Sequence, residues 1–133
     1  MASNQVLAMV LAGGKGERLY PLTEDRSKPA VPFGGNFKLI DFTLSNCIHS
    51  GFKNIKILTQ YKSESLDNHI SIWKKIHNRM GTCRDINTIK STGIHMYRGT
   101  ADAIRQNIRT IEENKPDYVL ILSSDHVYSM DYS

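Results

Sequence analysis

Three short apolar runs recur along the chain, and polar or glycine residues follow each of them. Residues 6–12 are continuously apolar and lead directly into two glycines. Residues 52–59 alternate in part between apolar and polar positions, and residues 117–123 are again strongly apolar. Runs of this length predict strands, and an unbroken apolar run indicates burial on both faces of a parallel sheet. Each predicted strand ends near polar residues that could face a ligand.

Between these runs, the apolar positions follow a helical period. Residues 41–50 carry apolar side chains on one side after an aspartate suited to a helix N-terminus, and Gly51 follows them. Residues 63–76 form a second amphipathic segment. The clearest predicted helix begins at Thr100, repeats apolar residues at spacings of three and four, and ends before Pro116.

Strands that alternate with helices of this length predict βαβ crossovers, so we expect an α/β, Rossmann-like fold. In such a fold the sheet is mostly parallel and helices cover both of its faces. Residues 81–95 show weak periodicity and many polar positions, which predicts a long loop or an irregular strand pair. At 133 residues, the chain fits one domain or part of one.

Composition excludes several classes of protein. Hydrophobic residues make up 40% and charged residues 23% of the chain, as in ordinary soluble proteins. The net charge of 17 − 13 = +4 favours anionic partners such as nucleotides. The lysines and arginines are scattered rather than gathered in a stripe, which argues against nucleic acid as the partner. Two isolated cysteines, no paired His spacing and no membrane-length apolar run predict a cytoplasmic protein without a zinc site or a membrane anchor.

The first predicted strand ends in the glycine-rich turn Gly13-Gly14-Lys15-Gly16, which suits phosphate binding. Glycine admits positive φ and lets a ligand approach the backbone N–H groups without a Cβ clash. The Walker pattern is absent, and Leu19 stands where the dinucleotide fingerprint requires its third glycine. A plain tight turn explains the glycines alone equally well. The cations Arg18 and Lys28, on a loop punctuated by prolines, favour phosphate binding.

Asp125 follows the third predicted strand, at the end of a parallel sheet where ligands bind. Carboxylate oxygen suits Mg²⁺, which usually takes one or two protein carboxylates together with substrate phosphates. Asp125 is therefore our candidate metal ligand, with a turn or helix cap as its alternative role. We interpret the adjacent His126 as structural, because phosphoryl transfer depends on alignment and charge more than on proton transfer. Cys47, on a predicted apolar helix face, is interpreted as a core residue.

Four blocks of sequence together resemble one enzyme family. They are residues 11–35, residues 37–47, residues 97–103 (YRGTADA) and residues 124–128 (SDHVY). In this order and spacing they are similar to the sugar nucleotidylyltransferases, and most closely to the bacterial glucose-1-phosphate adenylyltransferase branch. The resemblance implies that residues 1–133 are the N-terminal portion of the nucleotidyltransferase catalytic domain. The remainder of that domain and the C-terminal β-helix would be absent.

The resemblance also implies a role for individual residues. The nucleoside triphosphate would be held by Leu11, Ala12, Gly13, Gly14, Lys15 and Gly16, with Gly99 and Thr100 near its base and ribose. Arg18 would contact the departing phosphates, and Lys28 would neutralise charge on the reacting phosphates. Tyr97 would border the sugar-phosphate pocket. From the residues alone, capping of the following helix explains Thr100 at least as well, and ordinary packing explains Tyr97.

The reaction implied is ATP plus α-D-glucose 1-phosphate to ADP-glucose plus diphosphate, assisted by Mg²⁺. A homotetrameric enzyme of glycogen or starch synthesis is implied, of which this portion alone would turn over weakly or not at all. Residues 85–93 contain no glutamine, whereas the adenylyltransferases have a glutamine-containing stretch there that helps to recognise adenine. An enzyme for UTP or dTTP is therefore an alternative. The other alternative is a non-catalytic regulatory subunit, against which the intact Lys28 and Asp125 argue.

Overall fold

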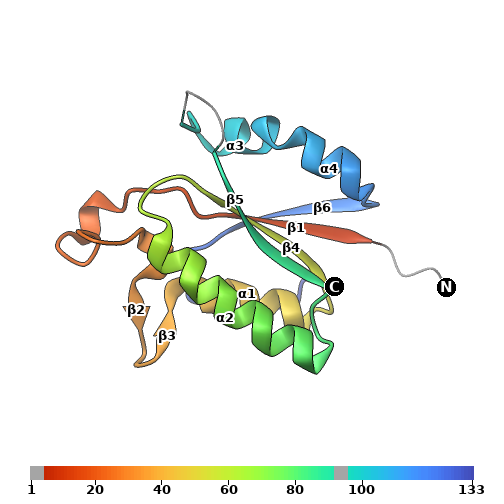
Figure 1. The fold of residues 1–133 in the computed structure, drawn as a ribbon, viewed down its shortest axis with the longest axis horizontal. Helices are drawn as coiled ribbons and strands as arrows, with labels where there is room; N and C mark the ends of the chain where they lie inside the picture. The colour runs from red at the N-terminus through yellow and green to blue at the C-terminus, as the bar shows by residue number, and fades with distance from the viewer. Residues whose placement is uncertain (1–4, 92–95) are drawn as a thin grey trace.

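The computed structural model describes residues 5–91 and 96–133 and contains a four-stranded parallel sheet (Figure 1). Its spatial order β5-β4-β1-β6 is formed by β1 (Val6–Leu11), β4 (Asn54–Thr59), β5 (Asp85–Lys90) and β6 (Tyr118–Ser123). In Figure 1, α1 (Leu39–His49) and α2 (Glu64–Met80) lie below the sheet. The helices α3 (Thr100–Gln106) and α4 (Ile108–Asn114) lie above it. The expected α/β, Rossmann-like fold is confirmed.

The inner strand β1 is buried on both of its faces, as its unbroken apolar run predicted. Ala8 and Val10 belong to the core cluster on the side of α1 and α2, and Leu7 and Met9 belong to the cluster on the side of α3. All four side chains are fully buried. Cys47 of α1 is also fully buried in the first cluster, so its interpretation as a core residue is confirmed. β1 therefore anchors both layers and fixes the position of the turn that follows it.

The helix expected to begin at Thr100 and end before Pro116 is instead two short helices that meet at Asn107. The side-chain amide of this buried residue donates to the carbonyl oxygen of Ala103 at 2.8 Å. In a continuous helix that carbonyl would accept the main-chain N–H of Asn107, which here turns to Ile104 at 3.0 Å. Asparagine side chains compete with the helix ladder in this way, and the helix therefore ends and restarts.

The segment predicted as a long loop or an irregular strand pair contains one regular strand, β5, within residues 81–91, and residues 92–95 of this prediction lie outside the described residues. It pairs in parallel with β4 along its whole length, and Ile55 lies opposite Ile86. The buried Lys56 of β4 also forms an ion pair with Asp85. β5 lies at the edge of the sheet, so an apolar run is not required there, and the sequence pattern was correspondingly weak.

The connection from β1 to α1 contains only short elements. These are η1 (Glu17–Leu19), η2 (Lys28–Ala30) and a hairpin of β2 (Pro32–Phe33) with β3 (Phe37–Lys38). α1 then begins two residues earlier than expected, and Asp41 in its first turn accepts the backbone N–H of Lys38 at 2.8 Å. The other carboxylate oxygen of Asp41 contacts His69 and Trp73 of α2 at 2.5 and 2.8 Å. One buried carboxylate thus links the two helices below the sheet.

The strand order reverses at β1. The chain passes from β1 to β4 and β5 on one side, and β6 returns to the opposite side of β1. Open α/β sheets bind ligands at the carboxyl ends of the strands where this reversal occurs. The residues that follow β1 and β6 therefore occupy the expected ligand position. Within the described residues, no helix is both long and apolar enough to cross a membrane.

Candidate active site

The glycine-rich turn leaves β1 and folds back toward Lys28. Ala12 still donates to the Leu58 carbonyl at 2.9 Å, which holds the start of the turn in the sheet. Gly16 has a φ of +67°, and a Cβ placed on it would lie 2.8 Å from the Cβ of Lys28. Glycine is therefore required at this position for both backbone conformation and space. The close approach brings the backbone of the turn against the base of the Lys28 side chain.

Lys28 and Asp125, which are 97 positions apart in the sequence, form a direct ion pair. The Lys28 Nζ atom lies 2.6 Å from Asp125 Oδ2, and the side chains are 35% and 27% exposed. Partial burial raises the pKa of Asp125, but the hydrogen bonds from Lys28 and Ser123 outweigh it and leave that pKa below its ordinary value. The carboxylate is therefore ionised at neutral pH, as a ligand for a hard cation must be.

The position of Asp125 is fixed by two serines at the end of β6. Ser124 Oγ donates to the Leu11 carbonyl of β1 at 2.6 Å, and the Ser123 hydroxyl donates to Asp125 itself. Thr43 Oγ1 of α1 also donates to the Ser123 carbonyl at 2.9 Å. These bonds join the ends of β1 and β6 and aim the carboxylate at the glycine-rich turn.

An inner pocket of about 280 Å³ opens between the glycine-rich turn and the start of α3. Its first wall is formed by Leu11, Ala12, Gly13, Gly14, Lys28, Pro29, Ser123, Ser124 and Asp125, and its second by Leu58, Tyr97, Gly99, Thr100 and Ala103. The first wall supplies backbone groups and charges, and the second is largely apolar. Such a pocket suits a ligand with a flat apolar part and an anionic part.

An outer hollow of about 650 Å³ adjoins this pocket. It is lined by Gly14, Lys15, Gly16, Glu17, Arg18, Leu19, Lys28 and Asp125. Gly14, Lys28 and Asp125 line both spaces. Every site residue predicted from the sequence therefore lines one of two adjoining spaces, although Lys15, Gly16 and Arg18 lie only in the outer one. Their individual roles remain predictions.

Tyr97 is half-buried, and both of its ends are held. Its hydroxyl accepts from Asn107 Nδ2 at 3.1 Å, and its backbone N–H donates to the side chain of Gln60 at 2.8 Å. The same Gln60 side chain donates to the Gly13 carbonyl at 2.9 Å. Sequence reasoning missed both Gln60 and Asn107. The signal for Gln60 was its place directly after β4, the strand beside β1, but a single polar residue there is weak evidence.

Thr100 does not cap α3 as its alternative role required. Gly99 is the N-cap residue, and Thr100 is the first residue of the helix. Gly99 is exposed, and its φ of +155° turns the chain into the helix beside the pocket. Capping therefore does not explain a threonine at position 100. Thr100 does line the inner pocket.

His126 is mostly exposed, and its Nε2 atom lies 3.6 Å from Asp125 Oδ1. The ring also makes an edge contact with Tyr128. Across residues 5–91 and 96–133, no three His, Cys, Asp or Glu side chains gather into a metal-binding group. His95, one of the histidines whose spacing argued against a zinc site, lies outside the described residues. Asp125 is thus the acidic side chain that the two spaces share.

Comparison with known proteins agrees with this arrangement. The family model for nucleotidyl transferases matches residues 7–133, which is nearly the whole chain. The chain belongs to the nucleotidyl transferase family. All of the site residues predicted above fall inside the matched range.

Several relatives in this family are named glucose-1-phosphate adenylyltransferase. That of Corynebacterium glutamicum (strain R) is 54% identical over 129 residues, which cover 96% of this chain and 32% of the relative. That of Bifidobacterium longum (strain NCC 2705) is 51% identical over 96% of this chain and 31% of the relative. That of Clostridium novyi (strain NT) is 49% identical over 100% of this chain and 36% of the relative. The chain therefore spans about a third of the length of the curated relatives it matches.

Proposed function

We propose that this chain supplies the nucleotide-binding part of a glucose-1-phosphate adenylyltransferase. The reaction joins ATP and α-D-glucose 1-phosphate to give ADP-glucose and diphosphate, as a step of glycogen or starch synthesis. The observation that carries the proposal is the meeting of the glycine-rich turn, Lys28 and Asp125 at the point where the strand order reverses. The names of the relatives, at 49–54% identity, support the choice of substrates.

In this proposal the nucleoside lies in the inner pocket and the triphosphate crosses Gly14 into the outer hollow. The apolar second wall, with Tyr97 and Ala103, receives the base and ribose. Backbone N–H groups of the turn face the phosphates, and the exposed Lys15 and Arg18 lie where the outer phosphates would be. The two spaces share Lys28, which places its charge beside the α-phosphate between them.

The chemistry is an in-line displacement at the α-phosphorus. A phosphate oxygen of glucose 1-phosphate forms the new bond to this phosphorus, and the bond to the oxygen that bridges to the β-phosphate breaks. Diphosphate leaves with the electron pair of that bond. Two anions must approach each other, so catalysis depends on alignment and on cations fixed in advance. Lys28 and Arg18 are the residues of this chain that meet the requirement.

Asp125 fits the proposed Mg²⁺, because its ionised carboxylate faces the space assigned to the phosphates. One carboxylate with substrate phosphates is a usual environment for this ion. When bound, Mg²⁺ would neutralise phosphate charge and polarise the phosphoryl oxygens. Lys28 now occupies one oxygen of Asp125. We propose that Lys28 turns from this oxygen to the phosphates when nucleotide and metal bind.

The same fold and cations would serve an enzyme that uses UTP or dTTP. A nucleotidylyltransferase for one of these nucleotides is therefore the second candidate function. A homotetramer and a cytoplasmic location complete the proposal by family resemblance. The non-catalytic subunit is disfavoured because Lys28 and Asp125 are both present and in contact.

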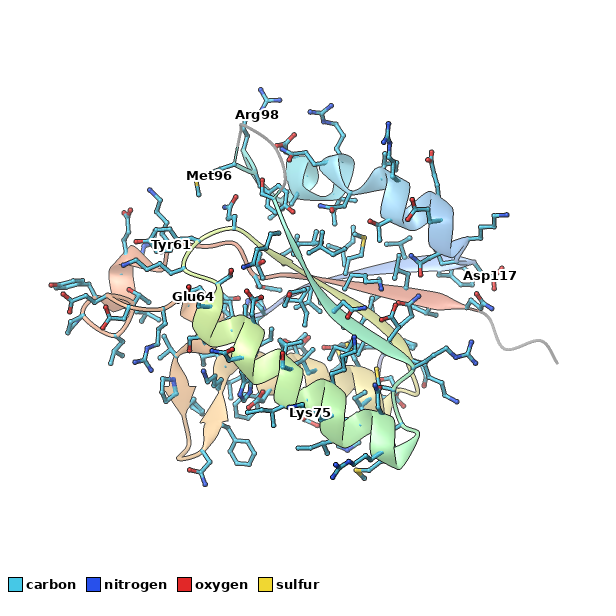
Figure 2. All side chains as sticks on the ribbon, viewed as in Figure 1. Tyr61, Glu64, Lys75, Met96, Arg98 and Asp117 are labelled. Atoms are coloured by element: carbon cyan, nitrogen blue, oxygen red, sulfur yellow. The ribbon has the colours of Figure 1, made fainter. Side chains whose placement is uncertain are left out.

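Titration of the chain with ATP, UTP and dTTP in the presence of Mg²⁺ tests the proposal. We expect ATP to bind most tightly and Lys28→Ala to weaken its binding about tenfold or more, as for loss of a charge-assisted contact. Lys75→Ala is the matched control, because Lys75 is exposed on α2, away from the site (Figure 2). Tighter binding of UTP or dTTP would reassign the base. Equal effects of the two lysine variants would refute the site.

A further inference from the structure

Gln60 connects the two walls of the inner pocket from behind. It follows β4 directly, and it is not among the residues that line the pocket. Its Nε2 donates to the carbonyl of Gly13 at 2.9 Å, and its Oε1 accepts the backbone N–H of Tyr97 at 2.8 Å. One side chain therefore spans from the glycine-rich turn to the segment that leads into α3, with a hydrogen bond at each end.

Gly13 is shaped to receive this side chain. A Cβ placed on Gly13 would lie 3.0 Å from Gln60 Cγ and 3.1 Å from Cδ, which is closer than real Cβ atoms normally approach. The φ of Gly13 does not lie in the left-handed region. Glycine at this position is therefore favoured by space rather than by conformation, since any larger residue would push the Gln60 side chain aside by a few tenths of an ångström. The turn therefore passes close to the Gln60 side chain and is hydrogen bonded to it.

The second wall depends on Gln60 for its backbone position. The hydroxyl of Tyr97 is held by the buried Asn107, and the ring packs against the core cluster that contains Leu58 and Ala103. Those contacts fix the side chain, and the main-chain N–H of Tyr97 is held by its hydrogen bond to Gln60. Gly99 and Thr100 follow within three residues, so a shift of the Tyr97 backbone moves this part of the wall.

We propose that Gln60 is a positioning residue that sets the width of the inner pocket by holding Gly13 and Tyr97 at a fixed separation. Because it joins backbone groups, it orders both walls before the ligand arrives. This inference rests on the proposed function, since it assumes that a nucleoside occupies the space between the walls. Losing both hydrogen bonds weakens nucleotide binding by roughly tenfold, because two net bonds of ordinary strength are removed from the arrangement that binds.

The test compares wild type with Gln60→Met, which keeps the length of the side chain but removes both hydrogen bonds. The first measurement is backbone amide hydrogen exchange of residues 97–100 without ligand. The second is the Kd for ATP with Mg²⁺. We expect faster exchange and a roughly tenfold higher Kd in Gln60→Met. Gln106→Met is the matched control, since the exposed Gln106 bonds only to Asp102 of its own helix among the bonds the structure shows.

A second variant separates positioning from simple loss of stability. Gln60→Glu keeps the shape of the side chain, but its carboxylate accepts from Tyr97 and has no proton to donate to Gly13. Protonation restores the donor. We therefore expect its affinity, measured against wild type at each pH, to recover as the pH falls toward about 4. Gln60→Met should show no such recovery, and because glutamine and methionine are both uncharged, weaker binding in Gln60→Met cannot be caused by charge repulsion.

The possible outcomes separate the positioning role of Gln60 from the proposed function. Unchanged exchange and unchanged Kd in Gln60→Met overturn the positioning role. Faster exchange with unchanged Kd also overturns it, because the bond would then hold the wall without affecting the ligand. If wild type binds no nucleotide with Mg²⁺, the proposed function fails and the nucleotide-positioning role fails with it. The exchange data would then still decide whether Gln60 orders the Tyr97 segment.

Discussion

The contact between Lys28 and Asp125 predicts that one substitution has opposite effects with and without metal. In Asp125→Asn, the negative charge beside the proposed phosphate site is removed and Lys28 loses its partner. Nucleotide alone should then bind more tightly than to wild type, because it no longer faces a carboxylate. Nucleotide with Mg²⁺ should bind more weakly, because the proposed metal ligand is gone.

The magnitudes follow from the geometry of the pair. Lys28 and Asp125 are 35% and 27% exposed, and a pair this open to solvent contributes about 0–1 kcal/mol to stability, so the variant should remain folded. A unit charge a few ångströms from another in water interacts by about 1 kcal/mol, which corresponds to about fivefold tighter binding of metal-free ATP. Loss of a metal-positioning group typically costs 10–100-fold in metal affinity, so at least about tenfold weaker binding of Mg²⁺-ATP is expected.

Isothermal titration calorimetry with ATP in EDTA, and then in excess Mg²⁺, measures both effects. Asp117→Asn is the control, because Asp117 precedes β6 as Asp125 follows it and accepts the backbone N–H of Gln5. Figure 2 shows Asp117 at the opposite end of the sheet from Tyr61 and Arg98. The control should leave both affinities unchanged. Wild-type affinity of Asp125→Asn for Mg²⁺-ATP, or weaker binding of metal-free ATP, would refute the reasoning.

Three further predictions concern stability and can be read from the fluorescence of Trp73, the only tryptophan, during denaturation by urea. Gly16→Ala should lower the free energy of unfolding by about 1–2 kcal/mol, because φ is +67° and the new Cβ would meet Lys28 at 2.8 Å; an unchanged midpoint would contradict this. Asp41→Asn should lower the free energy of unfolding by about 1.5–3 kcal/mol, since the buried carboxylate accepts three hydrogen bonds. In the control Glu113→Gln, at an exposed position of α4, the free energy of unfolding should change by no more than about 0.5 kcal/mol. Burial raises the pKa of Asp41, but its hydrogen bonds from His69, Lys38 and Trp73 leave this pKa lower than in the unfolded chain. The wild type should therefore lose stability as the pH falls below about 5, and Asp41→Asn should lose stability less steeply over the same range.

Most of the sheet and the helices below it followed from the sequence, because their patterns are local. β1 is buried on both faces, so its residues had to be apolar in succession, and the run was visible without any partner. The amphipathic segments 41–50 and 63–76 likewise appear as α1 and α2, with boundaries shifted by a few residues. The glycine-rich turn was placed correctly because it follows directly from the end of β1.

The elements that the sequence did not reveal depend on contacts made elsewhere in the chain. β5 is a strand because it pairs with β4, and the Lys56–Asp85 ion pair joins them. Its own residues are mostly polar. The break at Asn107 depends on which acceptor its side chain finds, and a spacing of apolar residues cannot show that.

The residues of the candidate site were visible in the sequence, but their contacts were not. The sequence by itself determined which residues carry suitable chemistry: glycines after a buried strand, cations on a stiff loop, and Asp125 after another strand. Only the tertiary structure decided that Lys28 and Asp125 touch, that two adjoining spaces hold all of the predicted residues, and that Gln60 ties Gly13 to Tyr97. The physical reason is distance along the chain: local patterns record burial and backbone conformation, whereas a contact across 97 positions exists only once the strands have paired.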